Sequence, residues 1–373
     1  MFELTNEQRK CFALPPVSQA WTRIEVKPHP CDMCYTFAYL DGNRVARVIR
    51  VLDEQEGHEF YQELTIDAEL NDERTMLLPK TAKGKPVQLT ASNLLRRTPV
   101  GMGLSYKQSY ITIDNYSSNQ TFYHTGYDDT VRIKGFAMFE QWVKDWCRET
   151  DEKQYQRIQS FSMRKRCHQK YREGDFFRFR ISRTLYGYGR ILLDYSRMRK
   201  AGIEFWDIFM GKPLCVAVYH IATENDRLLP DELVRLNRLP SHMIMDDALF
   251  YGDFTIIGHL PLTESEKDYP IHYGDSITMG ESCVCYQQGE DFIRLPDAKQ
   301  LYPGFRSSGI GWHLLLRLSV LESCIACGSN EPYWQADFDY RIKDDLRNPI
   351  HRAALERIRA QVGLTCGAAP SAE

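Results

Sequence analysis

The stretch that most constrains this sequence is residues 173–194, which reads EGDFFRFRISRTLYGYGRILLD. Apolar Phe177, Phe179 and Ile181 alternate with polar residues, the two-residue period of a strand that has one buried and one solvated face. A second aromatic and apolar run begins at Tyr186 after a polar break. The stretch therefore predicts a β-hairpin.

Two glycines lie inside the second run of this hairpin. Gly187 and Gly189 are separated by one residue, and because glycine weakens a strand they predict a bulge, a tight bend or a close backbone approach. Strands of small closed barrels bend in this way. A phosphate-binding glycine loop would need a following helix and a third glycine, and the sequence has neither at the required positions. We expect the glycines to serve the fold.

Length and composition favour two globular domains of the α+β class. The chain has 373 residues, of which 43% are hydrophobic and 12% aromatic, enough to bury a core in each half. We expect an N-terminal mixed domain with a small antiparallel sheet and a packed helix, followed by a mostly antiparallel, small barrel-like β domain with C-terminal helices. The expected segments are a domain at 1–150, a charged linker or exposed helix at 151–172, the β-rich domain at 173–364 and a disordered tail at 365–373.

Local patterns place the elements of both domains. Asp41-Gly42-Asn43 between two alternating runs predicts a hairpin over 34–52, and the aromatic stripe at 136–150 has helical spacing. Asn348, Pro349 and Gly363 predict the start and end of a last helix over 349–362. The other expected strands are 60–66, 106–114, 121–124, 203–208, 214–221, 254–260, 282–287 and 292–295, and the other expected helices are 231–235 and 313–327.

Charge and cysteine usage suggest a cytoplasmic protein. Lys and Arg total 47 against 50 Asp and Glu, so the global charge indicates neither nucleic acid nor an anionic membrane as a partner. Eleven cysteines follow no short repeating frame, and the N-terminus has no apolar stretch of signal-peptide length. We expect free thiols, no membrane contact, and a solvated turn at the basic segment Lys80, Lys83 and Lys85.

Two Cys-x-x-Cys pairs raise the question of zinc. Cys31/Cys34 and Cys324/Cys327 lie almost a whole chain apart and neither has a histidine pair beside it. We expect no metal and no cofactor.

The usual catalytic signatures are missing from the sequence. It has no Gly-x-Ser-x-Gly, no His-Glu-x-x-His and no Walker loop, and its ten histidines are dispersed. Local groups of carboxylates at 246–253 and 264–268 are typical of an exposed acidic face, because no apolar pocket that would raise their pKa is evident. We expect a protein that is not an enzyme.

The hairpin and a later segment carry a family resemblance. GDFFRFRISRTLYGYGRIL, followed by DFTIIGHLPL at 253–262, resembles the immunity protein 26 family of bacterial polymorphic toxin systems over about residues 170–300. The resemblance implies a mostly β domain that binds and neutralises a cognate toxin in the cytoplasm and that carries no catalytic residues. The motif positions, which we expect to maintain the fold, are Gly174, Asp175, Tyr186, Gly187, Tyr188, Gly189, Arg190, Gly258, His259 and Pro261.

The acidic loops are the expected contact face for such a toxin. Many toxins of this kind act on nucleic acids, as a nuclease does, and are basic, so carboxylates would steer their approach. The expected contact residues are Asp246, Asp247, Tyr251, Asp253, Glu264, Glu266 and Asp268.

Two other functions compete with toxin binding. Arg178, Arg180, Arg183 and Arg190 would suit a nucleic-acid-binding or ribonuclease-like small barrel, although no base or acid is evident beside them and we expect no direct nucleic-acid contact. The third reading is enzymatic immunity, in which the N-terminal domain reverses a modification made by the toxin.

Overall fold

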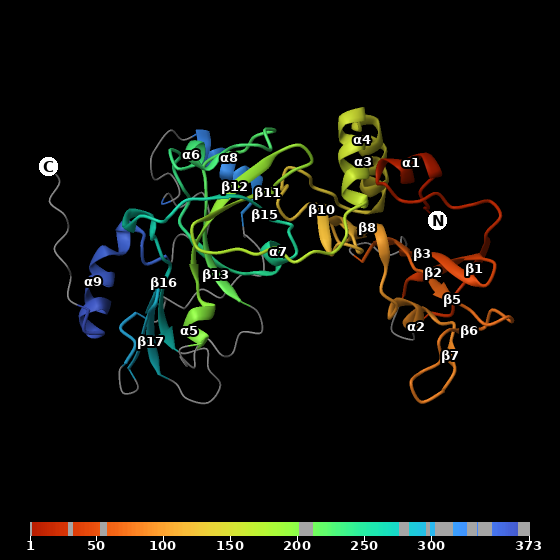
Figure 1. Cartoon of the computed structure of the whole chain (residues 1–373), viewed down its shortest axis with the longest axis horizontal. Coiled ribbons are helices and arrows are strands. Elements are labelled where there is room, and N and C mark those ends of the chain that lie inside the picture. The colour runs from red at the N-terminus through yellow and green to blue at the C-terminus, as the bar shows by residue number, and fades with distance from the viewer. Residues whose placement is uncertain are drawn as a thin grey trace. The chain divides into compact units, whose positions relative to one another are not determined.

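The structure is a computed structural model (Figure 1), and it describes residues 2–28, 33–52, 58–200, 212–275, 283–295, 299–302, 316–326, 334 and 345–364. The chain forms two compact units, Met1–His168 (unit 1) and Gln169–Glu373 (unit 2). Each unit combines antiparallel sheet with helices, so the expected α+β class is confirmed.

Unit 1 is built on an antiparallel sheet with strand order β1-β2-β3-β4-β8-β9-β10, in which β5 also pairs with β3. Its strands are β1 Thr22–Glu25, β2 Tyr35–Asp41, β3 Arg44–Leu52, β4 Phe60–Thr65, β5 Ala68–Glu69, β6 Met76–Leu77, β7 Val87–Gln88, β8 Val100–Lys107, β9 Tyr110–Asn115 and β10 Gln120–His124. Its helices are α1 Asn6–Cys11, α2 Ala91–Leu95, α3 Phe136–Glu149 and α4 Glu152–Ser162.

The hairpin predicted around Asp41-Gly42-Asn43 is confirmed as β2 and β3. Gly42 has φ +57°, a left-handed conformation that glycine adopts without steric cost. The prediction of a single strand at 106–114 is wrong, because β8 and β9 form a second hairpin there. Its turn residues, Gln108 and Ser109, have φ +47° and +75° although neither is glycine, so the usual turn signal is missing.

The predicted helix at 136–150 is confirmed as α3 and lies on one face of the sheet. The ring of its Phe139 stacks on Tyr106 of β8 with centroids 4.5 Å apart. Helix α4 occupies the segment expected as a linker or exposed helix, and it buries Ile158 and Phe161 in the same core. Ile158 and Phe161 thus form an apolar edge of α4 that packs on the core, although most of the helix is polar or charged.

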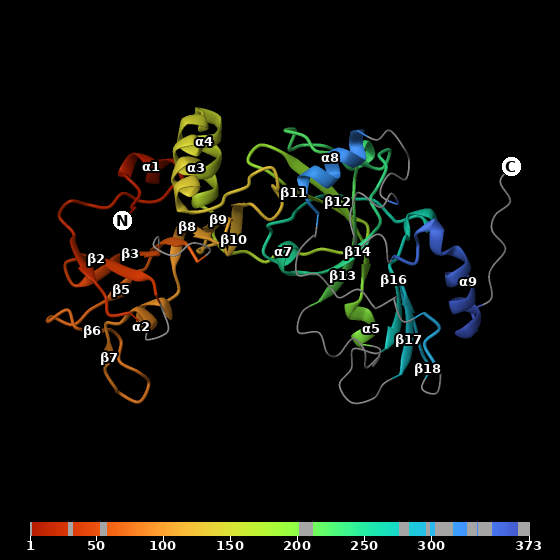
Figure 2. The same ribbon diagram turned by 180° about the vertical axis from the view of Figure 1, so that it is seen from behind.

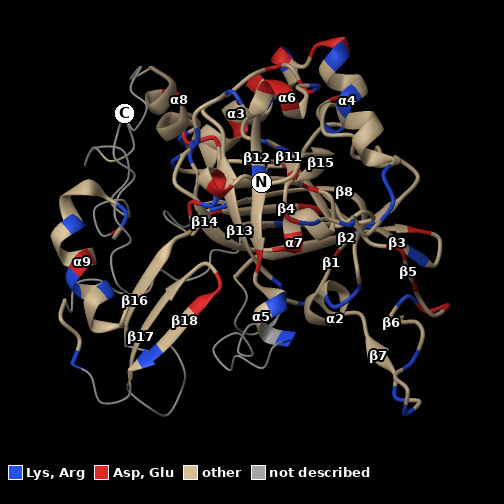
Figure 3. Ribbon diagram, turned by 60° about the vertical axis from the view of Figure 1, so that its left-hand side comes forward, with Lys and Arg blue, Asp and Glu red and all other residues tan. Residues whose placement is uncertain are grey.

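A short hairpin, β6–β7, carries the basic segment at its turn. Lys80, Lys83 and Lys85 are exposed there, visible as the blue tip beyond β7 in Figure 3. This arrangement agrees with the expected solvated turn.

Unit 2 contains an open antiparallel sheet with strand order β14-β13-β12-β11-β15 and a second sheet with order β16-β17-β18. Its strands are β11 Asp175–Arg180, β12 Tyr186–Asp194, β13 Pro213–Val218, β14 His242–Met245, β15 Thr255–His259, β16 Ile271–Asp275, β17 Val284–Gln288 and β18 Asp291–Leu295. Its helices are α5 Ser196–Lys200, α6 Pro230–Leu233, α7 Asp247–Phe250, η2 Glu264–Glu266, α8 Leu318–Ala326, η5 Pro349–His351 and α9 Arg352–Gln361.

The hairpin predicted over 173–194 is confirmed as β11 and β12, at the centre of the five-stranded sheet. Among the described strands this sheet does not close into a barrel, because β14 and β15 are its two edges. The prediction that one face of β11 is exposed to solvent is wrong. Arg178 and Arg180 are half-buried, and both guanidinium groups lie over the ring of Tyr186, 5.1 and 4.9 Å from its centroid.

The two glycines of β12 admit aromatic rings from the neighbouring strand. Phe177 pairs with Gly189 and Phe179 with Gly187, so each ring lies across the glycine opposite it. A Cβ atom on Gly187 would lie 2.5 Å from the Phe179 ring, and one on Gly189 would lie 2.3 Å from the Phe177 ring. The predicted close approach to these glycines is therefore made by the Phe177 and Phe179 side chains.

The second sheet packs against the C-terminal helix α9, as Figure 2 shows from behind. Tyr273, Val284 and Tyr286 of the sheet share a core with Ile358 of α9. Asn348 caps the predicted last helix by accepting a hydrogen bond from the Ile350 amide. The strand expected at 203–208, the start of the helix expected at 313 and the tail at 365–373 lie outside the described residues.

Candidate functional site

The first motif residues join the start of β11 to the end of β15. The Asp175 carboxylate is buried, and its Oδ1 lies 2.8 Å from Nδ1 of His259 while its Oδ2 accepts a hydrogen bond from the Arg172 amide. Gly174 has φ +86°, and a Cβ atom there would lie 2.4 Å from the carbonyl oxygen of Leu260. Only glycine allows the two segments to approach so closely.

Arg190 of β12 holds the segment that follows β15. Its side chain is 1% exposed and forms an ion pair with Glu266. The same guanidinium donates to the carbonyl oxygens of Leu260, at 2.7 Å, and Pro261, at 3.0 Å. Burial acts to raise the pKa of Glu266, but hydrogen bonds from Thr263 and the charge of Arg190 together hold the pKa below its ordinary value.

These contacts form what we call the motif network: Gly174, Asp175, Arg190, His259, Pro261 and Glu266. Gly258 extends it, because a Cβ atom there would lie 2.5 Å from the ring of Pro230 in α6. Its members come from the central hairpin and from the end of β15 with the loop that follows it, so they fix the position of residues 258–266 on the central hairpin. The loop after β15 is thereby held in place.

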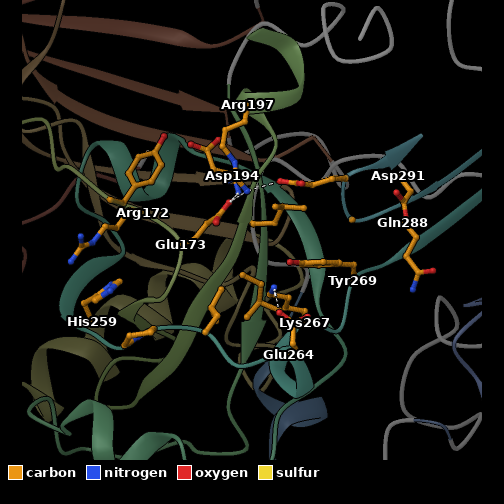
Figure 4. A pocket seen from close by; sticks show the side chains of 17 residues that line it. Arg172, Glu173, Asp194, Arg197, His259, Glu264, Lys267, Tyr269, Gln288 and Asp291 are labelled. Atoms are coloured by element: carbon orange, nitrogen blue, oxygen red, sulfur yellow. Dashed lines mark hydrogen bonds and ion pairs between the residues drawn. The ribbon is translucent and has the colours of Figure 1, made fainter. Parts of the chain in front are cut away.

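An open pocket of about 980 Å³ lies beside the motif network (Figure 4). Its lining comes from four segments, and in the figure Arg172 and His259 stand across the space from Tyr269, Gln288 and Asp291. The full lining is Tyr171, Arg172, Glu173, Leu192, Leu193, Asp194, Arg197, His259, Pro261, Leu262, Glu264, Lys267, Tyr269, Gln288, Gly289, Glu290 and Asp291. A cavity of this size is at the upper end of the range for ligand pockets.

Ion pairs tie the walls of the pocket together. Nη2 of Arg197 lies 2.6 Å from Oε1 of Glu173 and 2.6 Å from Oε1 of Glu290, bridging the start of β11 to the β17–β18 turn. At the opposite rim, Lys267 pairs with Glu264 at 2.5 Å. Figure 3 shows the β17–β18 turn, which carries Glu290, as a red stretch at one end of β18.

The floor of the pocket is apolar. Leu192 and Leu193 are buried beneath it, and the half-buried Leu262 and Tyr269 pack against them. Gly289 has φ +57°, and a Cβ atom there would lie 2.4 Å from the Tyr269 ring, so the ring and the turn lie in close contact. Burial, followed by nearby negative groups that include Glu173, raises the pKa of Tyr269 to about 12.

The family comparison bears on this same region. Residues 172–283 match the model of the immunity protein 26 family. The resemblance expected over about 170–300 is thus confirmed. The matched segment contains the motif network and, apart from Tyr171, three of the four pocket-lining segments. No curated protein and no solved structure matches the chain. Within the described ranges, no helix is both long enough and apolar enough to cross a membrane.

Three of the residues expected to contact a toxin are bonded to other residues of unit 2. Asp246 is 7% exposed and accepts hydrogen bonds from the hydroxyl of Tyr171 and the amide of Lys212. Glu266 pairs with Arg190, and Asp268 lies 3.0 Å from Arg347. All three carboxylates are bonded within unit 2. The low exposure of Asp246 and Glu266 corrects the expected exposed acidic face, whereas the Asp268 side chain is 44% exposed.

The remaining expected contact residues differ in exposure. Asp247, Tyr251 and Asp253 are half-buried in or just after α7. Glu264 has a side chain that is 90% exposed and it lines the pocket. Of the seven residues, Glu264 is therefore the one that is both exposed and part of the cavity.

The arginines of the central hairpin do not make an exposed phosphate-binding face. Arg190 is buried, and Arg178 donates to the carbonyl oxygen of Asp226. Arg180 donates to the carbonyl oxygen of Arg183 and stacks on Tyr186. These contacts use the cations within unit 2 and weaken the nucleic-acid reading.

The two Cys-x-x-Cys pairs lie only partly within the described residues. Cys31 and Cys327 lie outside the described residues, and only Cys34 and Cys324 of the two pairs lie within them. The described part of the chain has no group of three or more metal-ligating side chains. Arg197, Tyr269 and Glu290 were not predicted from the sequence. Their proximity depends on the β17–β18 turn meeting α5 and the Tyr269 ring, and no local pattern signals these contacts.

Proposed function

We propose that this protein is an immunity protein that binds a cognate bacterial polymorphic toxin in the cytoplasm and silences it by forming a stoichiometric complex. The family match over residues 172–283 carries the proposal. The motif residues in that segment make contacts within unit 2, such as those of Asp175 and Arg190, as expected of a scaffold that acts through its surface.

The proposed contact face is the rim of the pocket, including Glu264, together with the half-buried Asp247, Tyr251 and Asp253. Stable protein complexes bury about 1,600 Å² in total, so the toxin would cover more than the pocket itself. Exposed carboxylates at this rim would accelerate the approach of a basic toxin. Asp246, Glu266 and Asp268 support the loops that carry the face.

Stoichiometry separates this function from enzymatic immunity. The toxin domain encoded beside the gene for this chain would be co-expressed with it, and cell growth and residual toxin activity would be measured as the ratio of the two proteins is varied. Binding predicts that toxin activity falls in proportion to added protein and vanishes near equimolar amounts. Rescue by a small fraction of an equivalent, or turnover of a substrate by the purified protein alone, would contradict the proposal.

A further inference from the structure

We propose that the pocket beside the motif network receives a lysine or arginine side chain that projects from the bound toxin. This inference rests on the proposed function and names the chemistry of the partner at the site. Three properties of the pocket support it: the balance of its charges, its apolar floor and its fixed walls.

The lining carries more negative than positive charge. Its carboxylates are Glu173, Asp194, Glu264, Glu290 and Asp291, and its permanent cations are Arg172, Arg197 and Lys267, so five negative charges face three positive ones. Two of these cations are already neutralised within the lining, since Arg197 lies between two carboxylates and Lys267 pairs with Glu264. An incoming cation therefore meets a net negative potential.

The raised pKa of Tyr269 agrees with this charge balance. After burial and the neighbouring Cys215, the carboxylates of Glu173, Glu290 and Glu264 each disfavour loss of the phenol proton. The ring thus stands in the field of carboxylates from three separate wall segments. That field favours a positive group placed near the ring.

The floor suits the aliphatic part of a long basic side chain. Leu262 and the Tyr269 ring present apolar surface above the buried Leu192 and Leu193. Lysine and arginine bury their methylene stems on such surface while the charged group stays near carboxylates or over an aromatic face. An inorganic cation would make no use of this floor.

The walls are held in place before any partner binds. Arg197 bridges Glu173 to Glu290 of the β17–β18 turn, and Tyr269, from a third wall, lies against Gly289 of the same turn. Such preorganisation lowers the entropy cost of binding. A nucleic acid would be repelled by the excess of carboxylates, so a basic protein segment is the occupant that the charge and the floor both favour.

The test reverses two charges at the rim. Glu290 and Asp291 are exposed in the β17–β18 turn, and the variant Glu290→Lys/Asp291→Lys would be compared with the matched control Glu322→Lys/Glu356→Lys, which makes the same charge change at exposed positions of α8 and α9 outside the lining. Circular dichroism and thermal unfolding would establish that both variants fold. Calorimetry would measure Kd for the toxin domain encoded beside the gene.

We expect the pocket variant to raise Kd by at least about tenfold and the control to stay within about twofold of the unaltered protein. Raising NaCl from about 50 to about 500 mM should weaken binding of the unaltered protein more than binding of the pocket variant. Replacing the responsible toxin lysine or arginine by glutamate should restore binding to the pocket variant. Equal Kd values for the pocket variant and the control would overturn the inference.

Failure of this inference can be told apart from failure of the proposed function. If the unaltered protein neither binds nor neutralises the toxin, the proposed function fails. If it does both and the pocket variant is unimpaired, only the pocket assignment fails. Micromolar spermidine that binds the unaltered protein but not the pocket variant and leaves the toxin bound would assign the pocket to a free polyamine instead of a toxin side chain. A self-association of this chain that the pocket variant abolishes would assign it to a second copy.

Discussion

The guanidinium of Arg190 and the carboxylate of Glu266 form an ion pair that joins the centre of the β12 strand to the loop after β15. The Arg190 side chain is 1% exposed, whereas the Glu266 side chain is 17% exposed. The arginine also donates to two carbonyl oxygens of the same loop. The pair therefore fixes the loop that forms one wall of the pocket.

Removing the acid should destabilise unit 2. Glu266→Ala leaves a buried guanidinium with only its carbonyl partners, so we expect a loss of about 2 kcal/mol, below the 3–5 kcal/mol typical of fully enclosed pairs. Urea unfolding would measure it. Glu264→Ala, two residues earlier and exposed, should stay within about 0.5 kcal/mol of the unaltered protein. An equal effect of the two substitutions would show that the ion pair does not hold the loop.

Alanine at the β12 glycines should destabilise the hairpin by overpacking. We expect about 1–3 kcal/mol for each, with Gly189→Ala the more costly, because a Cβ atom there would also lie 2.8 Å from the carbonyl oxygen of Ala217. Combining Gly187→Ala with Phe179→Leu should cost about 1 kcal/mol less than the sum of the single changes, since the smaller side chain makes room. Strict additivity would refute the ring contact as the cause. Chemical denaturation of the four variants supplies the comparison.

The buried His272 should make stability depend on pH. Burial, assisted by the charge of Arg347, lowers the pKa of His272 to about 4, whereas an unfolded histidine titrates near 6.5. Between these values the unfolded chain binds a proton that the folded chain does not, so the free energy of unfolding should fall by about 3 kcal/mol as pH drops from about 6.5 to about 4. Unfolding of His272→Gln, measured over the same range, should lack this component. If the two proteins show parallel pH profiles, His272 is not responsible.

Arg347 should anchor the C-terminal segment to the five-stranded sheet. Its guanidinium donates to the hydroxyl and carbonyl oxygens of Ser241, at 2.9 and 2.8 Å, and pairs with Asp268 and Asp345 at 3.0 and 2.8 Å. Arg347→Ala should cost about 2–3 kcal/mol, because Ser241 and Asp345 lose a largely buried partner while the Asp268 side chain, 44% exposed, can be hydrated instead.

Hydrogen exchange gives the local measurement for Arg347. Amides of α9 should lose protection in the variant while those of unit 1 keep theirs, because unit 1 has its own core. Arg352→Ala, at an exposed position at the start of α9, serves as the control and should leave the exchange pattern unchanged. Uniform loss of protection in both units would contradict a local anchoring role.

Local patterns predicted much of the fold. The hairpins at Gly42 and at residues 173–194, helix α3, and the cap at Asn348 each depend on a few neighbouring residues, so their signals survive in the sequence alone. The solvated face of β11 was predicted wrongly, because alternating arginines normally indicate exposure and nothing local reveals that Tyr186 lies beneath them.

The candidate site could be predicted only in part. The motif positions were identified, but the pocket depends on the β17–β18 turn meeting α5 across about ninety residues of sequence, a contact that no periodicity encodes. The acidic loops were likewise recognised as acidic, whereas the burial of Asp246 follows from the distant Tyr171.

The Arg347 contacts also bear on how this protein can be divided. The stretch shared with the immunity protein 26 family ends at residue 283, yet Ser241 and Asp268 inside that stretch are bonded to a side chain more than sixty residues beyond its end. A fragment trimmed to the homologous boundaries would open this polar cluster to water and strip α9 from Tyr273. The matched stretch is therefore shorter than the piece of chain that packs together, and expression trials should extend through residue 364.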